Sequence, residues 1–164
     1  MNTKGILKKA LVLTLAFQIL MVACPAAATA SPAKIIDFYI VAGLGGFPGP
    51  WSSSGLVTSS GTATVDPFVA GWDSELGIPA TIHDTFVLTD VHGSITFKGQ
   101  AKSAIVSDNN GDPVRGYELR WVIISATGAY TNLYGQGAGY AWLDFTSGTF
   151  PIYLSGQAHY DPQQ

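Results

Sequence analysis

Cysteine is almost absent from this chain, which has 164 residues and a single cysteine, Cys24. Cys24 lies within an N-terminal segment, residues 1–30, that we expect to be removed during export. The mature chain, from Ser31 to Gln164, then has no thiol. Disulfide bonds, thiol nucleophiles and cysteine-based metal sites are therefore excluded from it, even in a compartment that permits disulfides.

Charge is also scarce, because Asp, Glu, Lys and Arg make up only 12% of the residues. All 11 acidic residues follow residue 30, but only five of the eight basic ones do, so the mature chain has a net charge of −6. Nucleic acids and anionic lipids both require a basic surface on their partner. We therefore expect no nucleic-acid partner.

Several catalytic and metal-binding patterns are missing as well. No serine stands in a Gly-x-Ser-x-Gly elbow, so a serine-hydrolase triad has no support. The three histidines, His83, His92 and His159, lack the spacing of a zinc site, and His92 lies in a predicted turn. We interpret them as structural or surface residues, and we expect neither a metal nor a bound organic cofactor.

Residues 1–30 have the features of a signal peptide. Lysines at positions 4, 8 and 9 precede an apolar run over residues 10–23, and Ala28-Thr29-Ala30 supplies the small residues that signal peptidase requires. The run is too short to span a bilayer as a helix, so we expect no transmembrane span after processing. The mature chain, residues 31–164, is then a single domain that is secreted or periplasmic.

The segment Leu20-Met21-Val22-Ala23-Cys24 leaves a second possibility open, because it resembles a bacterial lipobox. In a lipobox the cysteine is lipidated and becomes the new N-terminus. The usual pattern has Leu, Val or Ile three residues before the cysteine, where this chain has Met21. We therefore favour an incidental cysteine, with a lipid anchor through Cys24 as the alternative.

The mature chain has the sequence pattern of β-strands. Short segments rich in β-branched and aromatic residues alternate with turns, and no long segment has helical periodicity. The predicted strands cover residues 34–41, 54–66, 81–90, 95–107, 114–125, 135–145 and 150–160. Residues 43–50 are a predicted loop, 67–79 are predicted to be irregular, and Gly55 and Gly61 are predicted kinks or bulges. These lengths favour an all-β fold, a closed antiparallel β-barrel of about eight strands.

The stretch Arg120–Gly137, RWVIISATGAYTNLYGQG, carries a resemblance to a known family. Its turn Thr127-Gly128-Ala129-Tyr130 and the following Gly-led segment are similar to the allene oxide cyclase and dirigent barrel superfamily. Small exported bacterial proteins of this type also have Arg-Trp-Val before the turn and end near Gly-Gln-Ala-His, as at residues 156–159. The resemblance is specific over residues 118–161, and Ala126 replaces the first turn glycine of the family.

The resemblance implies an eight-stranded antiparallel barrel with a hydrophobic cavity, often assembled into a homo-oligomer. In plant members the cavity directs the cyclisation of an unstable epoxide or the coupling of phenolic radicals. The catalytic carboxylate of the plant cyclases and the cavity acids of the dirigent proteins match no position of this chain. The resemblance therefore implies the fold and leaves the activity open.

Asp84 is the first candidate catalytic residue. It alternates with Ile82, Phe86 and Leu88, so its carboxyl group would point into an apolar interior if these residues face inward. Loss of hydration would then raise its pKa and make it a general acid or base near neutral pH. The alternative is an inverted face or a strand end, where Asp84 is solvated.

Glu118, a second catalytic candidate, shares a strand face with Arg120, a candidate ligand-binding residue. A buried Glu118–Arg120 pair could orient a polar group of a ligand. We favour a surface location for both, because Leu119, Trp121 and Ile123 form the more apolar face of the same strand.

Aromatic residues are concentrated near the C-terminus and are candidates for a pocket that holds a flat apolar ligand. They are Tyr117, Trp121, Tyr130, Tyr134, Tyr140 and Trp142. Trp121, Tyr130 and Tyr134 are the ligand-binding candidates, and ordinary core packing is the alternative for all of them.

Together these features favour an exported barrel that binds a small hydrophobic molecule in its cavity and acts on it, if at all, as a cofactor-free cyclase or isomerase. The alternative is a non-enzymatic structural or interaction module at the cell surface. The two differ in the interior of the barrel, since a binding protein needs a cavity and a structural module can fill the space with side chains.

Overall fold

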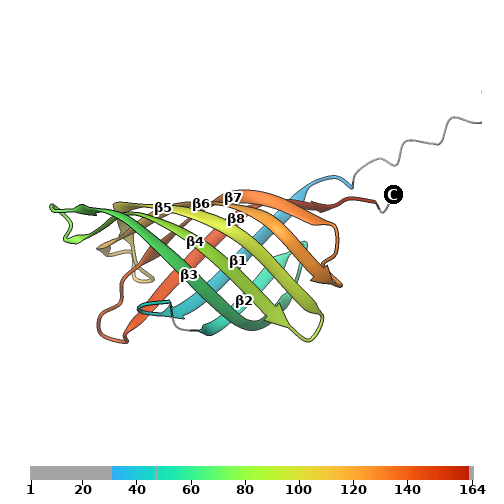
Figure 1. Cartoon of the computed structure of the whole chain (residues 1–164), viewed down its shortest axis with the longest axis horizontal. Helices are drawn as coiled ribbons and strands as arrows, with labels where there is room; N and C mark the ends of the chain where they lie inside the picture. Colours follow the sequence, from blue (N-terminus) through green and yellow to red (C-terminus); the bar gives the residue numbers. More distant parts are fainter. Residues whose placement is uncertain (1–30, 47, 163–164) are drawn as a thin grey trace, which may run out of the picture.

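The computed structural model describes residues 31–46 and 48–162, which form eight strands and their connecting turns (Figure 1). The strands are β1 (Lys34–Gly43), β2 (Gly49–Gly55), β3 (Ser59–Asp73), β4 (Ile78–Asp90), β5 (Gly93–Ser107), β6 (Pro113–Gly128), β7 (Leu133–Trp142) and β8 (Thr149–Tyr160). Each strand pairs antiparallel with the next and β8 pairs with β1, so the sheet closes into a barrel. The prediction of an all-β chain with eight antiparallel strands is confirmed. The predicted signal peptide lies outside the described residues.

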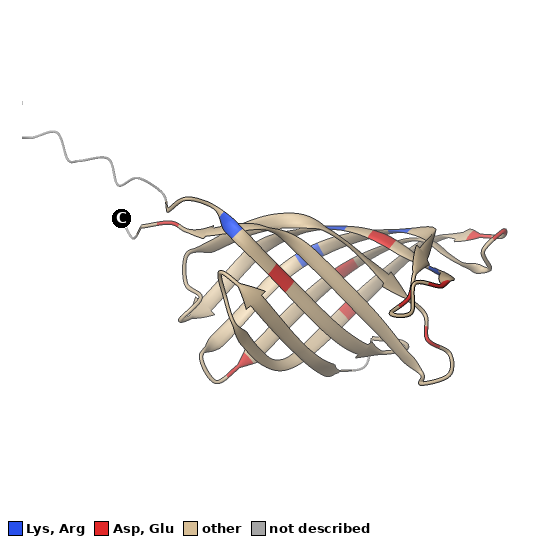
Figure 2. Ribbon diagram, turned by 180° about the vertical axis from the view of Figure 1, so that it is seen from behind, with Lys and Arg blue, Asp and Glu red and all other residues tan. Residues whose placement is uncertain are grey.

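The two ends of the ring carry different turns (Figure 1). The proximal end, our term for the end near residue 31 and the C-terminus, carries the β2–β3, β4–β5 and β6–β7 turns. The distal end carries the other four connections. Most acidic residues lie in turns or at strand ends, whereas the basic residues lie along strands (Figure 2). In the part of the chain that the structure describes, no helix is long and apolar enough to cross a membrane.

Strict alternation along the strands builds the core, because successive side chains of a strand point to opposite faces. On β4, Ile82, Phe86 and Leu88 share a buried face with Asp84, as predicted, and the alternate residues His83, Thr85 and Val87 lie on the outer face. The predicted hairpin over residues 95–125 is also confirmed: β5 and β6 pair along their length around the turn at Asn109–Gly111.

The pairing of β5 with β6 contains one bulge, within the stretch singled out from the sequence. Thr96 pairs with Ser125, but the next residue, Phe97, pairs with Ile123, so Ile124 is an extra residue on β6. Such a bulge shifts the alternation of the strand by one position. As a result Ala126 packs against the core, in line with the inward-facing Ile123 rather than with the exposed Ile124.

Aromatic side chains fill the middle of the ring. Phe38, Phe86, Phe97 and Trp121 are buried, with ring centroids 4.8 Å apart for Phe86 and Phe97 and 5.7 Å apart for Phe38 and Trp121. Trp51 packs against the same group, 6.4 Å from Phe38. The central part of the barrel is therefore a packed core rather than an open channel.

Two glycines make room for the largest of these side chains. A Cβ atom at Gly137 would lie 2.8 Å from Cζ2 of Trp121, and one at Gly156 would lie 2.6 Å from the same atom. Such distances are well inside van der Waals contact, so any larger residue at either position would displace the indole ring. Gly137 on β7 and Gly156 on β8 thus leave the space that the indole ring of Trp121 on β6 occupies.

The predicted boundaries are wrong between residues 43 and 79. Residues 49–55 form strand β2, although 49 and 50 belong to the predicted loop and 54 and 55 to the start of the predicted strand over 54–66. Strand β3 covers 59–73, which includes part of the segment predicted to be irregular. The sequence of β2, GPWSSSG, has only one large apolar residue, Trp51, and its position depends on backbone pairing with β1 and β3. Gly55 ends β2 with a positive φ of 88° instead of bending a longer strand.

Pro67 lies within β3, where a proline normally interrupts a ladder because it has no N–H group. The pairing of β2 with β3 ends at Ala63, so β3 has no β2 neighbour at Pro67. Its other neighbour, β4, places Asp84 opposite Pro67. Proline is tolerated there because this part of β3 is a free edge.

Candidate functional site

The structure places Asp84 inside the ring, on the face that it shares with Ile82, Phe86 and Leu88. Its side chain is 4% exposed, and it is the only charged residue among the buried ones of residues 31–46 and 48–162. Its neighbours across the sheet are Pro67 on β3 and Gly99 on β5. Neither neighbour carries a polar side chain, so the strands beside Asp84 offer its carboxyl group no side-chain partner.

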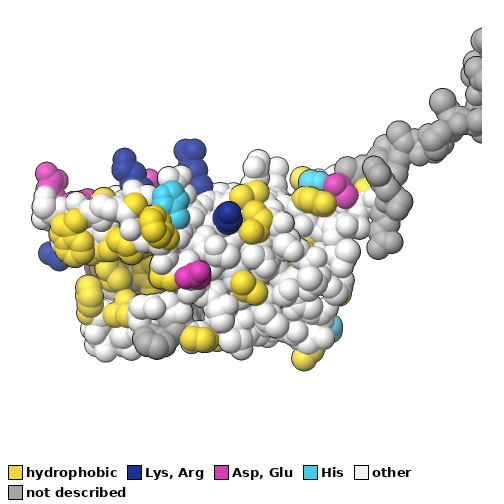
Figure 3. Space-filling model, viewed as in Figure 1, with side chains coloured by type: hydrophobic (Ala, Val, Ile, Leu, Met, Phe, Trp, Pro, Cys, Tyr) yellow, Lys and Arg dark blue, Asp and Glu magenta, His cyan; other side chains and the backbone are white. Residues whose placement is uncertain are grey.

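A cavity of about 180 Å³ adjoins Asp84 at the distal end of the ring. The residues around it are mostly apolar and include Val65, Ile82, Tyr117, Leu143 and Phe150. Figure 3 shows a hollow with hydrophobic side chains at this end of the molecule. The cavity is of the size that holds one aromatic ring, since an engineered apolar cavity of about 150 Å³ binds benzene. It is smaller than the roughly 300 Å³ of ordinary ligand pockets.

Burial dominates the electrostatics of this cavity. Loss of hydration raises the pKa of Asp84 from 3.8 to about 7. The Oδ2 atom of Asp84 is buried and has no hydrogen-bond partner among the described residues. Burial also raises the pKa of Tyr117 to about 12, with a smaller contribution from the negative charge of Asp84. Near neutral pH the cavity therefore contains a neutral phenol and a carboxyl group that is close to half ionised.

This arrangement can do two things chemically. A protonated Asp84 donates a hydrogen bond to a carbonyl or ether oxygen, and an ionised Asp84 accepts one from a hydroxyl or pairs with a basic nitrogen. A group with a pKa near the ambient pH can also exchange a proton with a bound molecule. Apart from the Tyr117 hydroxyl group, the other side chains around the cavity supply only apolar contacts.

Tyr117 was recognised in the sequence only as one member of an aromatic cluster. It is almost fully buried, and its ring meets that of Phe150 edge-on, with centroids 5.8 Å apart and planes at 83°. Its position next to Asp84 follows from ring closure, which brings β6 and β8 together with β4 at the distal end. The sequence signal that could have found it is its place in the inward-facing series with Leu119 and Trp121.

The other predicted site residues do not join Asp84. Glu118 and Arg120 lie exposed on the outer face of β6, so they form no buried pair. Trp121 is part of the packed core, where its indole N–H donates a hydrogen bond to the carbonyl oxygen of Ala138 at 3.3 Å. The predicted location of Glu118 and Arg120 on the polar face, opposite Trp121, is confirmed.

The remaining two ligand-binding candidates are near the proximal end. Tyr130 is buried, and its hydroxyl group donates a hydrogen bond to Asp90. Tyr134 is half exposed on the outer face of β7, and its ring stacks on that of His159 at a centroid distance of 6.0 Å. Neither residue touches the cavity beside Asp84.

Asp90 is a second carboxylate with an unusual environment, and the sequence did not single it out. Its oxygens accept hydrogen bonds from the hydroxyl groups of Ser59 and Tyr130 and from the backbone N–H groups of His92 and Gly93, at 2.7 and 3.0 Å for the last two. Burial alone would raise the pKa of Asp90, but these hydrogen bonds outweigh it and lower the pKa to about 2. Through these hydrogen bonds Asp90 links the β2–β3, β4–β5 and β6–β7 turns.

In the described residues, no three His, Cys, Asp or Glu side chains come together as a metal site. Comparison with known proteins found no matching protein family, no matching characterised protein and no matching solved structure. The case for a function therefore depends on the geometry of the chain itself.

Proposed function

We propose that this chain is an exported barrel protein that binds a small, mostly apolar molecule in the distal cavity, with Asp84 holding its single polar or basic group. The observation that carries the proposal is the buried Oδ2 atom of Asp84, which has no hydrogen-bond partner among the described residues and belongs to a side chain that adjoins an apolar cavity. The eight-stranded ring is also the architecture that the resemblance to allene oxide cyclase and dirigent barrels implies.

The energetic cost of Asp84 argues for a role beyond packing. A buried polar group without a partner destabilises a folded protein by about 1–3 kcal/mol, so buried polar groups in proteins are almost always satisfied. A leucine at this position would extend the apolar series of β4 without that cost. An arriving ligand that hydrogen bonds to Asp84 would offset the cost and gain affinity from it.

Proton transfer is a second function that a specific observation favours. A carboxyl group with a pKa of about 7 beside a mostly apolar cavity is suited to general acid–base catalysis at neutral pH. It would act on the bound molecule as an acid or base in a cofactor-free isomerisation or cyclisation. Tyr117, which stays protonated, would serve as a second hydrogen-bond donor.

Native mass spectrometry of the protein purified from its own host tests the binding proposal. We expect a small-molecule adduct on the wild-type chain that disappears on denaturation and is lost in Asp84→Leu. Asp66→Asn, an exposed carboxylate on the neighbouring strand β3, is the matched control and should keep the adduct. The covalent mass would also show whether the chain begins at Ser31 or at a lipidated Cys24.

A wild-type chain without any adduct, which also fails to bind benzyl alcohol and benzylamine in calorimetric titrations, would contradict the proposal. The packed centre of the ring would then favour the alternative, a structural or interaction module at the cell surface.

A further inference from the structure

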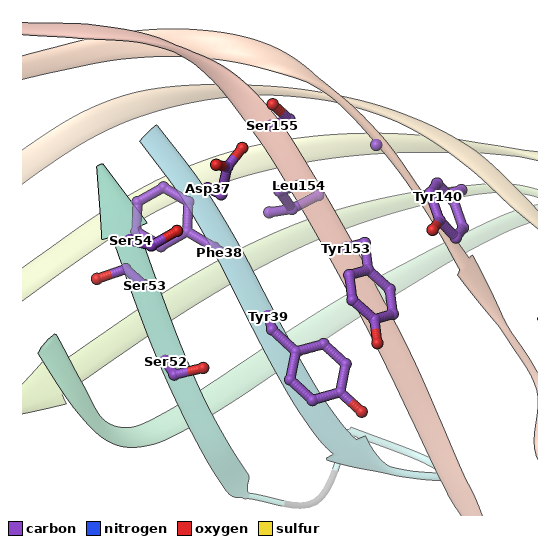
Figure 4. A pocket seen from close by; sticks show the side chains of 11 residues that line it. Asp37, Phe38, Tyr39, Ser52, Ser53, Ser54, Tyr140, Tyr153, Leu154 and Ser155 are labelled. Carbon is purple, nitrogen blue, oxygen red and sulfur yellow. The ribbon is translucent and has the colours of Figure 1, made fainter. Parts of the chain in front are cut away.

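Three tyrosines on neighbouring strands lie in a row on the outside of the ring, with their aromatic rings against one another (Figure 4). Tyr39 on β1 pairs across the sheet with Tyr153 on β8, and Tyr153 pairs with Tyr140 on β7. The ring centroids are 4.4 Å apart for the first pair and 5.4 Å apart for the second. Trp142 lies nearly parallel to Tyr153, with planes at 11°. The Tyr153 hydroxyl group donates a hydrogen bond of 2.8 Å to Asn109 Oδ1, which ties this surface to the β5–β6 turn.

The tyrosines border a shallow hollow of about 530 Å³ over β2, β1, β8 and β7. Figure 4 shows Asp37, Ser155 and the three serines of β2, Ser52–Ser54, around the same hollow. Asp37 and Ser155 occupy the next outward-facing row along the strands, since Asp37 pairs with both Ser54 and Ser155. The hollow thus combines an aromatic side with hydroxyl groups and one carboxylate.

Two neighbouring hollows extend this one around the ring. One, of about 840 Å³, shares Gly139 and Tyr140 with the first and is bordered by Gln100, Lys102, Glu118 and Arg120. The other, of about 550 Å³, shares Ser155 with the first and is bordered by Arg120, Gln136 and Gln157. We call the three hollows together the outer groove. Its lining residues come from seven adjacent strands, from β2 through β1, β8, β7, β6 and β5 to Thr81 on β4, so the outer groove curves around most of the outside of the closed ring.

The chemistry of the outer groove selects for a neutral ligand with many hydroxyl groups. Its two carboxylates, Asp37 and Glu118, are balanced by Lys102 and Arg120, and the other polar groups are hydroxyls and amides. A sugar ring has a face of C–H groups that packs on the electron-rich face of an aromatic ring, and its hydroxyl groups exchange hydrogen bonds with such side chains. We propose that the outer groove binds a neutral oligosaccharide.

Other ligands fit this surface less well. An extended peptide binds to a β-sheet mainly by adding a strand at a free edge, and the strands under the groove are paired on both sides. A nucleic acid needs a basic surface, which the balanced charges do not provide. The groove lies outside the ring, so this proposal is independent of the function proposed for the Asp84 cavity.

Isothermal titration calorimetry of the mature chain with cellohexaose, chitohexaose and maltohexaose tests the inference. We expect saturable binding of at least one of the three sugars. Tyr140→Ala should weaken it at least about tenfold, as the loss of a central aromatic contact does in other interfaces. Trp72→Ala removes another exposed aromatic side chain outside the groove and should leave the affinity unchanged, as should Asp84→Asn. Circular dichroism would show that each variant is folded.

Two results would overturn the proposal. One is the absence of saturable binding to all three sugars by the folded wild-type chain. The other is a wild-type oligomer that Tyr140→Ala converts to a monomer, because the groove would then be an interface between copies of this chain. An equal loss of affinity in Tyr140→Ala and Trp72→Ala would contradict the location of the site.

Discussion

Asp84 and Asp90 belong to the same inward-facing series of β4 but have opposite surroundings. Asp90, at the proximal end, accepts four hydrogen bonds from three different turns, and its pKa is lowered to about 2. Asp84, closer to the distal end, has a buried oxygen with no partner, and burial raises its pKa to about 7. Of these two aspartates on the same strand, Asp90 thus stabilises the proximal end of the ring, whereas Asp84 destabilises the folded state near the distal end.

The difference separates a structural role from a functional one. The hydrogen bonds of Asp90 are all internal, so its environment is complete without any other molecule. The environment of Asp84 is incomplete, and the cavity beside it has room for the missing partner. Unsatisfied buried groups in a native protein mark sites where function has been favoured over stability.

The largest expected effect is the pH dependence that Asp84 imposes on folding. Its pKa of about 7 in the folded state exceeds the value of 3.8 expected for the unfolded chain, so the folded state binds the proton more tightly. The free energy of unfolding should therefore fall as the pH rises from 4 to 7, by up to about 4 kcal/mol, and then level off. Urea denaturation of the wild type and of Asp84→Asn at a series of pH values measures this decrease.

Asp84→Asn cannot ionise, so its stability should lack the decrease between pH 4 and 7. Asp66→Asn, on the exposed face of β3, should keep the wild-type profile. Parallel profiles for the wild type and Asp84→Asn would show that Asp84 ionises freely and is hydrated in solution.

The next effect concerns Asp90. Asp90→Ala removes four hydrogen bonds to a charged group and should lower the free energy of unfolding by about 2–3 kcal/mol at pH 7. The folded-state pKa of about 2 lies below the unfolded value of 3.8, so this contribution is present above pH 3.8 and is lost as the pH falls through 2. Its pH dependence is opposite in sign to that of Asp84.

Asp144→Ala is the matched control, because Asp144 accepts similar hydrogen bonds in an exposed turn at the distal end, from the backbone N–H groups of Thr146 and Ser147 and the Ser147 hydroxyl. It should cost clearly less stability than Asp90→Ala, since solvent replaces the lost partners of an exposed turn. Equal losses in chemical denaturation of the two variants would mean that Asp90 does not hold the proximal end together.

The strands that could be predicted from the sequence are those in which large apolar side chains alternate with polar ones. On β4 and β5 every second residue is apolar over most of the strand, so both the strand and its inward face follow from the sequence. β2 has mainly glycine and serine, and such a sequence is typical of a loop. Its strand conformation depends on pairing with β1 and β3 on either side, which a local pattern does not contain.

The candidate site was predictable in part for the same reason. The alternation of β4 indicates that Asp84 can face inward, but the sequence does not show whether a partner reaches it from another strand. Tyr117, Leu143 and Phe150 come from β6, the β7–β8 connection and β8, and closure of the ring brings them to one cavity. The hydrogen bond from Tyr130 to Asp90 is likewise a long-range contact, which the local sequence pattern does not contain.

The smallest expected effects are those of removing the hydroxyl groups of Tyr130, beside Asp90, and Tyr117, beside Asp84. Tyr130→Phe removes the hydrogen bond to Asp90 and should cost about 1 kcal/mol of unfolding free energy.

Burial and, secondarily, the charge of Asp84 raise the pKa of Tyr117 to about 12, and no hydrogen bond contributes to that shift. Tyr117→Phe should therefore change the stability by less than about 0.5 kcal/mol, because the lost hydroxyl group satisfies no other group in the described part of the chain. Its effect should appear instead in the affinity for the cavity ligand, where the hydroxyl group is a hydrogen-bond donor. If Tyr117→Phe loses as much stability as Tyr130→Phe and its ligand affinity is unchanged, Tyr117 has a structural role, as Tyr130 does, and no role in ligand binding.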